Sequence, residues 1–198
     1  MLEHGFKRLE ADHCVHIKRY DQVKYIILLL YVDGMLIVGY DKNKINRLKK
    51  DLGSKFAMKD LGPAQQILGM RILRDRKNKR LWLSQEKYIK KVLDKYNMKD
   101  AKLVGTPFAA HFKLSTELCS SNDKEKEEMS KIPYASTVGY LMYAVVCTQS
   151  DIAYSGGVVS RFLANPSKQH WEAIKWILRY LKGTNHYCLC FGHDEIVL

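Results

Sequence analysis

Residues 25–40 read Tyr-Ile-Ile-Leu-Leu-Leu-Tyr-Val-Asp-Gly-Met-Leu-Ile-Val-Gly-Tyr, a long apolar run rich in residues that favour β-strands. Asp33-Gly34 interrupts the run, and Asp-Gly is a strong signal for a two-residue hairpin turn. The stretch is too short and too interrupted to span a membrane, which needs about 20 mostly apolar residues. Nearly continuous apolarity indicates strands that are covered on both faces. The sequence therefore predicts a buried β-hairpin with Asp33 and Gly34 at its tip.

A carboxylate at the tip of a rigid hairpin is well placed to bind a metal ion. Asp and Gly are also the ordinary residues of a type I′ turn, so the pair alone does not separate a catalytic site from a structural turn. The sequence around the hairpin distinguishes these two interpretations.

Tyr31-Val32-Asp33-Gly34 resembles the Tyr-X-Asp-Asp signature of reverse transcriptases. Further blocks follow in the order and spacing of the copia-type LTR retrotransposon Pol polyprotein, and the chain is identified as a member of that family. These blocks extend over nearly the whole chain: Met58-Lys59-Asp60-Leu61-Gly62, Ile67-Leu68-Gly69-Met70, Leu81-Trp82-Leu83-Ser84-Gln85, Pro133-Tyr134-Ala135-Ser136, Val138-Gly139-Tyr140-Leu141-Met142-Tyr143, His170-Trp171-Glu172-Ala173 and Leu181-Lys182-Gly183-Thr184.

The resemblance implies an α+β fold: a partial polymerase palm with antiparallel hairpins and a flanking helix, then a helical thumb and a three-helix connection region. By this resemblance residues 1–83 are the partial palm and 84–114 the thumb. Residues 132–198 are the connection region that precedes a ribonuclease H domain, which we expect to be absent from this sequence. Between them, residues 115–131 are almost devoid of apolar side chains, which predicts a flexible linker and a domain boundary.

Local patterns agree with this division. An apolar stripe predicts an amphipathic helix over 41–56 with Asp41 or Asn43 as its N-cap. Residues 66–73 read as one strand, which the basic loop 74–80 joins to a short strand over 81–83 as a second hairpin. Helical periodicity then predicts helices at the ranges 85–96, 134–147, 151–163 and 167–181, and helix-compatible spacing is also present within 1–17.

Positive charge is concentrated in one segment. The net charge of the chain is +12, and residues 41–102 contain 19 Lys and Arg against seven Asp and Glu, which accounts for the entire excess. Such a segment is typical of proteins that bind a phosphate backbone, although a solvated surface is the alternative. The predicted nucleic-acid-binding residues, whose partner is an RNA/DNA primer–template duplex, are Lys49, Lys50, Lys55, Arg74, Arg76, Lys77, Arg80, Trp82, Lys87, Lys90 and Lys91.

The resemblance implies a catalytic site that uses Mg²⁺ or Mn²⁺. Nucleotide addition by two metal ions needs several carboxylates, and Asp33 supplies one as a remnant catalytic residue and metal ligand. The family's second hairpin aspartate falls on Gly34, and we expect a further aspartate of the family to lie upstream of Met1. We therefore predict a reverse transcriptase fragment that has no polymerase activity of its own.

Three alternatives remain open from the sequence: a nonenzymatic basic nucleic-acid-binding remnant, an inert relic, and a truncated version of a longer Pol polyprotein. The five cysteines form no disulfide or zinc pattern, which is typical of a reducing compartment. No segment resembles a signal peptide or a membrane span, so we expect a soluble, intracellular protein in the cytoplasm or nucleus.

Overall fold

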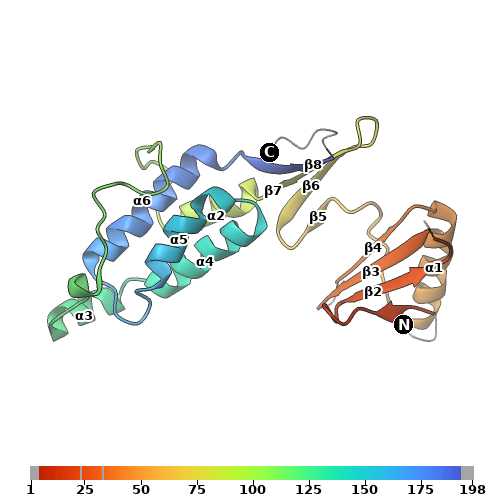
Figure 1. Ribbon diagram of the computed structural model, residues 1–198, viewed down its shortest axis with the longest axis horizontal. Coiled ribbons are helices and arrows are strands. Elements are labelled where there is room, and N and C mark those ends of the chain that lie inside the picture. The colour runs from red at the N-terminus through yellow and green to blue at the C-terminus, as the bar shows by residue number, and fades with distance from the viewer. Residues whose placement is uncertain (1–4, 23, 33, 193–198) are drawn as a thin grey trace. The chain divides into compact units, whose positions relative to one another are not determined.

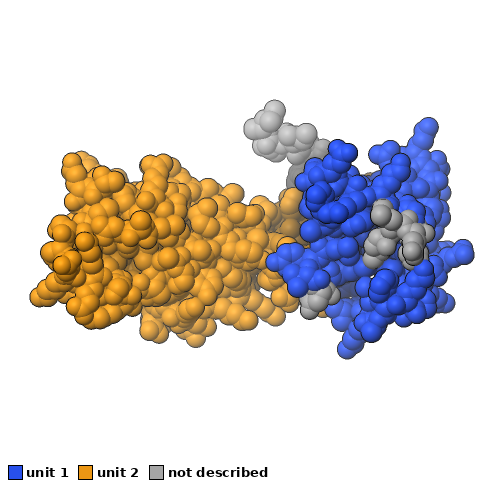
Figure 2. All heavy atoms as spheres, turned by 90° about the horizontal axis from the view of Figure 1, so that it is seen from below, with its two compact units in different colours: residues 1–64 blue, residues 65–198 orange. Residues whose placement is uncertain are grey.

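The computed structural model describes residues 5–22, 24–32 and 34–192. The chain divides into two compact units, residues 1–64 (unit 1) and residues 65–198 (unit 2), which are coloured separately in Figure 2. Each unit has a four-stranded antiparallel sheet, and the six α-helices of the described residues lie one in unit 1 and five in unit 2. The predicted combination of antiparallel hairpins and helices is confirmed.

Unit 1 is a sheet with one helix (Figure 1). Its strands follow chain order, and each is antiparallel to the next. Part of the segment 1–17, which has helix-compatible spacing, forms strands instead, because Lys7 and Arg8 pair with Ile17 and His16. The elements are β1 (Lys7–Arg8), β2 (Val15–Arg19), β3 (Tyr25–Tyr31), β4 (Gly34–Gly39) and α1 (Lys42–Lys55).

Helix α1 begins where the sequence predicted. The carboxylate of Asp41 accepts hydrogen bonds from the backbone N–H groups of Asn43 (2.9 Å) and Lys44 (3.3 Å), which satisfies donors at the free end of the helix. Leu48 and Leu52 then pack on Ile26 and Leu28 of the sheet. α1 therefore covers one face of the sheet.

Unit 2 combines a helical bundle with a second sheet at one end of it (Figure 1). The predicted helices over 85–96, 134–147, 151–163 and 167–181 are confirmed, with shifted ends. The elements are β5 (Gln66–Ile67), β6 (Met70–Asp75), β7 (Arg80–Ser84), α2 (Glu86–Lys95), η2 (Thr116–Leu118), α3 (Asp123–Ser130), α4 (Tyr134–Cys147), η3 (Ser150–Ile152), α5 (Ala153–Ser160), α6 (Lys168–Thr184) and β8 (Cys188–Phe191).

The strand predicted over 66–73 is wrong in one respect, because a tight turn divides it. Leu68 and Gly69 have φ values of 49° and 73°, and Ile67 pairs with Met70, so β5 and β6 form a two-residue hairpin. Two consecutive residues at positive φ are typical of a type I′ turn. The hydroxyl of Tyr143 on α4 donates to the Leu68 carbonyl, which fastens this turn to the bundle.

The structure also differs from the prediction of a flexible linker over 115–131. This segment contains η2 and α3, and it lies within unit 2, whereas the two units divide at 64/65. The Asn122 side chain accepts a hydrogen bond from the Glu125 N–H at 2.8 Å, and Met129 is buried at 5% exposure. A cap and one buried anchor are enough to order a short polar helix against a larger core.

A buried polar contact joins the sheet of unit 2 to the bundle. Gln85, between β7 and α2, is fully buried, and its Oε1 accepts a hydrogen bond of 2.7 Å from the Thr148 hydroxyl. The Gln149 side chain, 1% exposed, donates to the Tyr187 carbonyl just before β8 at 3.4 Å. The end of β7 and the start of β8 are therefore both held at the C-terminal end of α4.

Candidate nucleic-acid interface

The hairpin β3–β4 is present, but its turn lies one residue earlier than predicted. Tyr31 pairs with Gly34, so Gly34 is the first residue of β4 and not a turn residue. Val32 has a φ of 52° and is 93% exposed, an uncommon conformation for a β-branched residue. Asp33, the predicted catalytic residue and metal ligand, lies outside the described residues.

Gly34 has no conformational need to be glycine. It is not among the residues at positive φ, and a Cβ atom built on it would lie 3.4 Å from the Tyr31 carbonyl oxygen, an ordinary contact. The backbone at this position would therefore accept an aspartate. Glycine at position 34 leaves the hairpin without the carboxylate that the Tyr-X-Asp-Asp signature has there. The local backbone does not require glycine at this position.

The second hairpin, β6–β7, presents the predicted basic residues on a well-ordered turn. Asp75 shapes this turn: its Oδ1 accepts from the N–H groups of Lys77 and Asn78, both at 3.0 Å, and its Oδ2 from the Asn78 amide at 2.6 Å. These bonds, chiefly those from Asn78, hold the pKa of Asp75 below its usual value. Around the turn, the side chains of Arg74, Arg76, Lys77, Lys79 and Arg80 are exposed.

Trp82 lies in the middle of this sheet. It pairs with Leu73 on β6 and with Cys190 on β8. Because side chains alternate between the two faces of a sheet, Arg80 projects from the same face of β7 as Trp82. Arg71 also lies on that face, since it pairs with Ser84, two residues beyond Trp82. A half-buried indole with guanidinium groups on both sides is thus one feature of this face.

The predicted basic residues fall into two groups according to their partners. Lys49 Nζ lies 2.9 Å from Asp60, and Lys90 Nζ lies 2.6 Å from Glu86, so both lysines are engaged within the chain. The hydrogen bond from each lysine lowers the pKa of its carboxylate partner. The remaining basic residues of the predicted set are exposed and make no salt bridge with a described residue: Lys50 and Lys55 in unit 1, and Arg74, Arg76, Lys77, Arg80, Lys87 and Lys91 in unit 2.

Comparison with known proteins gives the same assignment as the motifs. Residues 1–110 match the family model described as reverse transcriptase (RNA-dependent DNA polymerase). The chain belongs to the reverse transcriptase family. It corresponds to part of the reverse transcriptase region of copia-type retrotransposon Pol polyproteins, as its relatives indicate.

Three relatives illustrate the match. The chain is 59% identical over 198 residues to the retrovirus-related Pol polyprotein from transposon TNT 1-94 of Nicotiana tabacum, covering 100% of this chain and 15% of that protein. It is 36% identical over 187 residues to the Pol polyprotein from transposon RE1 of Arabidopsis thaliana, covering 94% of this chain and 12% of that protein. A putative transposon Ty5-1 protein of Saccharomyces cerevisiae is 30% identical over 185 residues, 93% of this chain and 58% of that protein.

This reverse transcriptase chain thus spans only a small part of the two plant polyproteins. No solved structure matches it. Among the described residues, no helix is long and apolar enough to cross a membrane.

Reverse transcriptases use divalent metal ions, and the described residues do not fit such a site. Two-metal chemistry requires carboxylates that converge on one point. Within the described ranges, no group of three His, Cys, Asp or Glu side chains is arranged to hold a metal ion. Gly34, the first residue of β4, contributes no side-chain ligand. The Mg²⁺ or Mn²⁺ predicted for the family therefore has no such group of ligands among the described residues.

Sequence reasoning missed two kinds of residue in unit 2. Gln85 and Thr148 are polar but fully or nearly buried, and they hold the base of the basic hairpin. Trp176 on α6 is half-buried, unlike the fully buried Ile174 and Ile177, and it lines a cavity with Arg179. A useful signal was available for Trp176, because it falls outside the apolar stripe formed by Ile174, Ile177 and Leu181.

Proposed function

We propose that unit 2 holds an RNA/DNA primer–template duplex as part of a reverse transcriptase. The single observation that supports this is the β6–β7 hairpin: exposed cations that form no salt bridge with a described carboxylate lie along its turn, and Arg71 and Arg80 share one face with the half-buried Trp82. In this proposal the hairpin belongs to the palm region 1–83 and α2 begins the thumb region 84–114. Residues 132–198 form the connection region.

The physical basis is counterion release. Each Lys or Arg that approaches a phosphate displaces condensed cations from the nucleic acid, which favours binding at low salt. Arg74, Arg76, Lys77 and Arg80 lie within one short hairpin, and Lys87 and Lys91 follow one turn apart on α2. The Asp75-capped turn and the buried Gln85–Thr148 contact fix these charges to one rigid frame, so little order has to be gained on binding.

We further propose that this chain does not polymerise nucleotides. Gly34 lacks the carboxylate that the Tyr-X-Asp-Asp signature has at that position, and the described residues provide no cluster in its place. Binding without chemistry is the combination that these observations support.

The test is binding of the purified chain to an RNA–DNA hybrid across a salt series. In the wild type, we expect log affinity to fall linearly with log salt. A variant with Arg74, Arg76, Lys77 and Arg80 replaced by Gln should reduce that slope by up to about 3 to 4, because each phosphate contact contributes about 0.9. The matched control replaces Lys124, Lys126, Lys131 and Lys168, which have acidic neighbours around α3, by Gln.

The control carries the same change in net charge within the same unit, so it should leave the slope nearly unchanged. Equal losses in both variants would show that only the net charge matters and would overturn the assignment to the hairpin. Absence of salt-dependent binding by the folded wild type would overturn the proposal as a whole.

A further inference from the structure

A groove lies between α6 and the segment 111–114, away from the residues of the basic hairpin. It encloses about 590 Å³, within the usual range of 300–1,000 Å³ for small-ligand sites. One wall is the α6 face, and the other is the extended segment that precedes η2. The lining residues are Met98, His111, Phe112, Lys113, Leu114, Gln169, Glu172, Lys175, Trp176 and Arg179.

The aromatic part of this groove is held in place by contacts within unit 2. The Trp176 indole N–H donates to the Thr106 carbonyl at 2.9 Å. The rings of His111 and Phe112 meet the Trp176 ring edge-on, with centroids 5.6 and 5.9 Å away. Since His111 is exposed and Trp176 half-buried, their surfaces remain available to a flat ligand.

Arg179 is also held in position. Its guanidinium carbon lies 4.9 Å from the Trp176 ring centroid, and its Nε donates to the Lys102 carbonyl at 2.7 Å. Its Nη groups form no salt bridge with a described residue, so they remain available to an anion. A guanidinium stacked on an indole is already ordered, which lowers the entropic cost of binding.

The charge of the groove favours an anionic ligand. Lys113 is exposed and has no carboxylate partner within the described part of the chain, whereas Lys175 pairs with Glu172. Lys113 and Arg179 therefore leave an uncompensated positive charge beside the aromatic cluster. Phosphate groups form charge-assisted hydrogen bonds with Lys and Arg, and nucleic-acid bases stack on aromatic rings and guanidinium planes.

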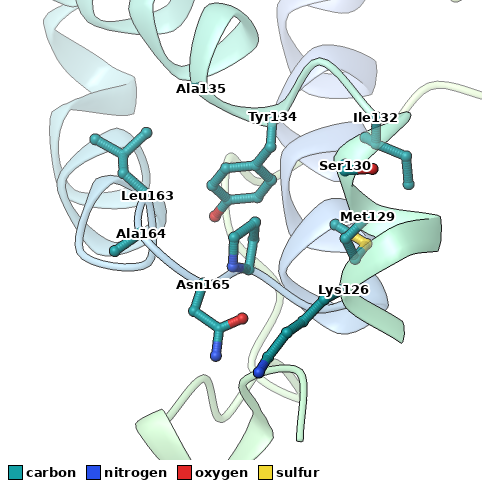
Figure 3. Close-up of a pocket in the computed structure, with 10 residues that line it drawn as sticks. Lys126, Met129, Ser130, Ile132, Tyr134, Ala135, Leu163, Ala164 and Asn165 are labelled. Carbon is teal, nitrogen blue, oxygen red and sulfur yellow. The ribbon is translucent and has the colours of Figure 1, made fainter. Parts of the chain in front are cut away.

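A second hollow of unit 2 serves as a comparison. It also encloses about 590 Å³, between α3, the start of α4 and residues 163–166 (Figure 3). Its one cation, Lys126, lies 3.8 Å from Asp123, and its aromatic residue, Tyr134, donates its hydroxyl to the Val159 carbonyl at 2.8 Å. Tyr134 is 3% exposed, so this hollow offers neither an open ring nor a free charge.

We propose that the α6 groove binds a short stretch of single-stranded nucleic acid. A base stacks on the surface formed by His111, Phe112 and Trp176, and the adjoining phosphates contact Lys113 and Arg179. This site goes beyond the duplex-holding hairpin, because it uses different residues and a different form of the ligand. Stacking makes it tolerant of sequence, since every base has an aromatic face.

The test uses the full chain and a labelled single-stranded oligothymidylate. The variant His111→Ala/Lys113→Glu changes two exposed side chains, so the fold should be kept, as thermal unfolding can verify. We expect about a tenfold loss of affinity, which corresponds to about 1.4 kcal/mol, because the variant removes one stacking ring and reverses one phosphate-binding charge. The control Lys124→Glu makes the same charge reversal on α3 and should change affinity less than about twofold.

A second readout is the NMR signal of the Trp176 indole N–H, assigned with Trp176→Phe. Oligothymidylate should shift this signal in the wild type and in the variant with the neutralised β6–β7 hairpin. That hairpin variant should lose RNA–DNA hybrid binding and keep single-strand binding. The experiment therefore tests the groove and the hairpin separately.

Several outcomes would overturn the groove assignment. These are no shift of the Trp176 signal, no binding of the single strand, or equal losses in the His111→Ala/Lys113→Glu and Lys124→Glu variants. Displacement of the Trp176 signal by an acidic peptide but not by the oligonucleotide would assign the groove to a protein partner and would equally reject the proposal.

Discussion

The two units bury their apolar side chains in different ways. Unit 1 places α1 on one face of its sheet, and its buried core consists of Phe6, Ile26, Leu28, Leu48 and Leu52. Unit 2 builds its core among helices, with fully buried residues on both α4 and α6. Its sheet is attached to that core through Gln85 and Thr148, through Tyr143 at the β5–β6 turn and through Gln149 before β8, and its β6–β7 turn presents charge to solvent.

The other face of the unit 1 sheet shows what this difference means. Strand alternation and pairing place two rows of aliphatic side chains there. No described element of unit 1 includes them in its core, and all are partly buried or exposed. The rows are Val15–Leu29–Leu36 and Ile17–Ile27–Val38. A β3–β4 hairpin with apolar side chains on both faces is suited to burial, whereas the β6–β7 hairpin is suited to a hydrated, charged partner.

The largest expected effect tests the two faces of β3 against each other. Leu28→Ala removes a side chain that is 0% exposed and should lower the free energy of unfolding of unit 1 by about 2–5 kcal/mol. Leu29→Ala, on the face that α1 does not cover, should cost about 1 kcal/mol. Hydrogen exchange with mass spectrometry during denaturant unfolding separates the two units. Protection of α4 and α6 should not change.

An equal cost for Leu28→Ala and Leu29→Ala would mean that both faces of the sheet are fully buried in solution. The two sheets would then not differ in how far their second face is exposed.

Much of this architecture follows from local sequence signals. Asp41 before an amphipathic stripe specifies the start of α1, and apolar runs around turn residues specify both hairpins. The β7–β8 pairing did not follow, because Leu81 and Phe191 meet across more than a hundred residues and no local pattern records such a contact. The left-handed Leu68 was missed because leucine is not a turn-forming residue.

The sequence predicted which residues of the candidate site are charged. It did not predict which of these charges are paired within the chain and which are free to contact a ligand. Composition identified the basic segment, but the partners of Lys49 and Lys90 emerge only when Asp60 and Glu86 have been placed in space. Trp82 was predicted from its strand, which follows the basic loop 74–80 and belongs to a block that resembles the family. The groove at Trp176 was not, since it depends on a segment that is far from α6 in sequence.

A smaller and pH-dependent effect is expected at the start of α6 in unit 2. His170 is 0% exposed, stacks on Phe162 with centroids 4.0 Å apart, and accepts a hydrogen bond of 2.9 Å from the Ser167 N–H through Nδ1. Burial lowers the pKa of His170 below its ordinary 6.5. The folded state therefore binds this proton less readily than the unfolded state, so stability is full above about pH 6.5 and falls as the pH decreases below it.

His170→Gln should remove this acid-dependent loss, because glutamine also accepts a hydrogen bond at the third position of a capping box. The stability of unit 2 is measured by thermal unfolding at several pH values between 5 and 8, with hydrogen exchange in α6 as the signal that reports on this unit. The exposed His186→Gln serves as the control and should keep the wild-type profile. A His170→Gln profile identical to that of the wild type would assign the acid sensitivity to other groups.

The smallest expected change in stability is at Gly34. A substitution there also tests whether the missing carboxylate limits activity. Gly34→Asp restores the Tyr-X-Asp-Asp pattern at a position whose backbone tolerates a Cβ atom. We expect the free energy of unfolding to change by no more than about 0.5 kcal/mol, as for most exposed positions.

Primer extension on an RNA template with Mg²⁺ or Mn²⁺ should remain at background in both the wild type and Gly34→Asp. Two-metal chemistry needs carboxylates that converge from more than one element, and two adjacent hairpin carboxylates alone do not hold both ions in place. Extension by Gly34→Asp but not by the wild type would show that one carboxylate separates this chain from catalysis, and extension by the wild type would reject the proposal that it binds without polymerising.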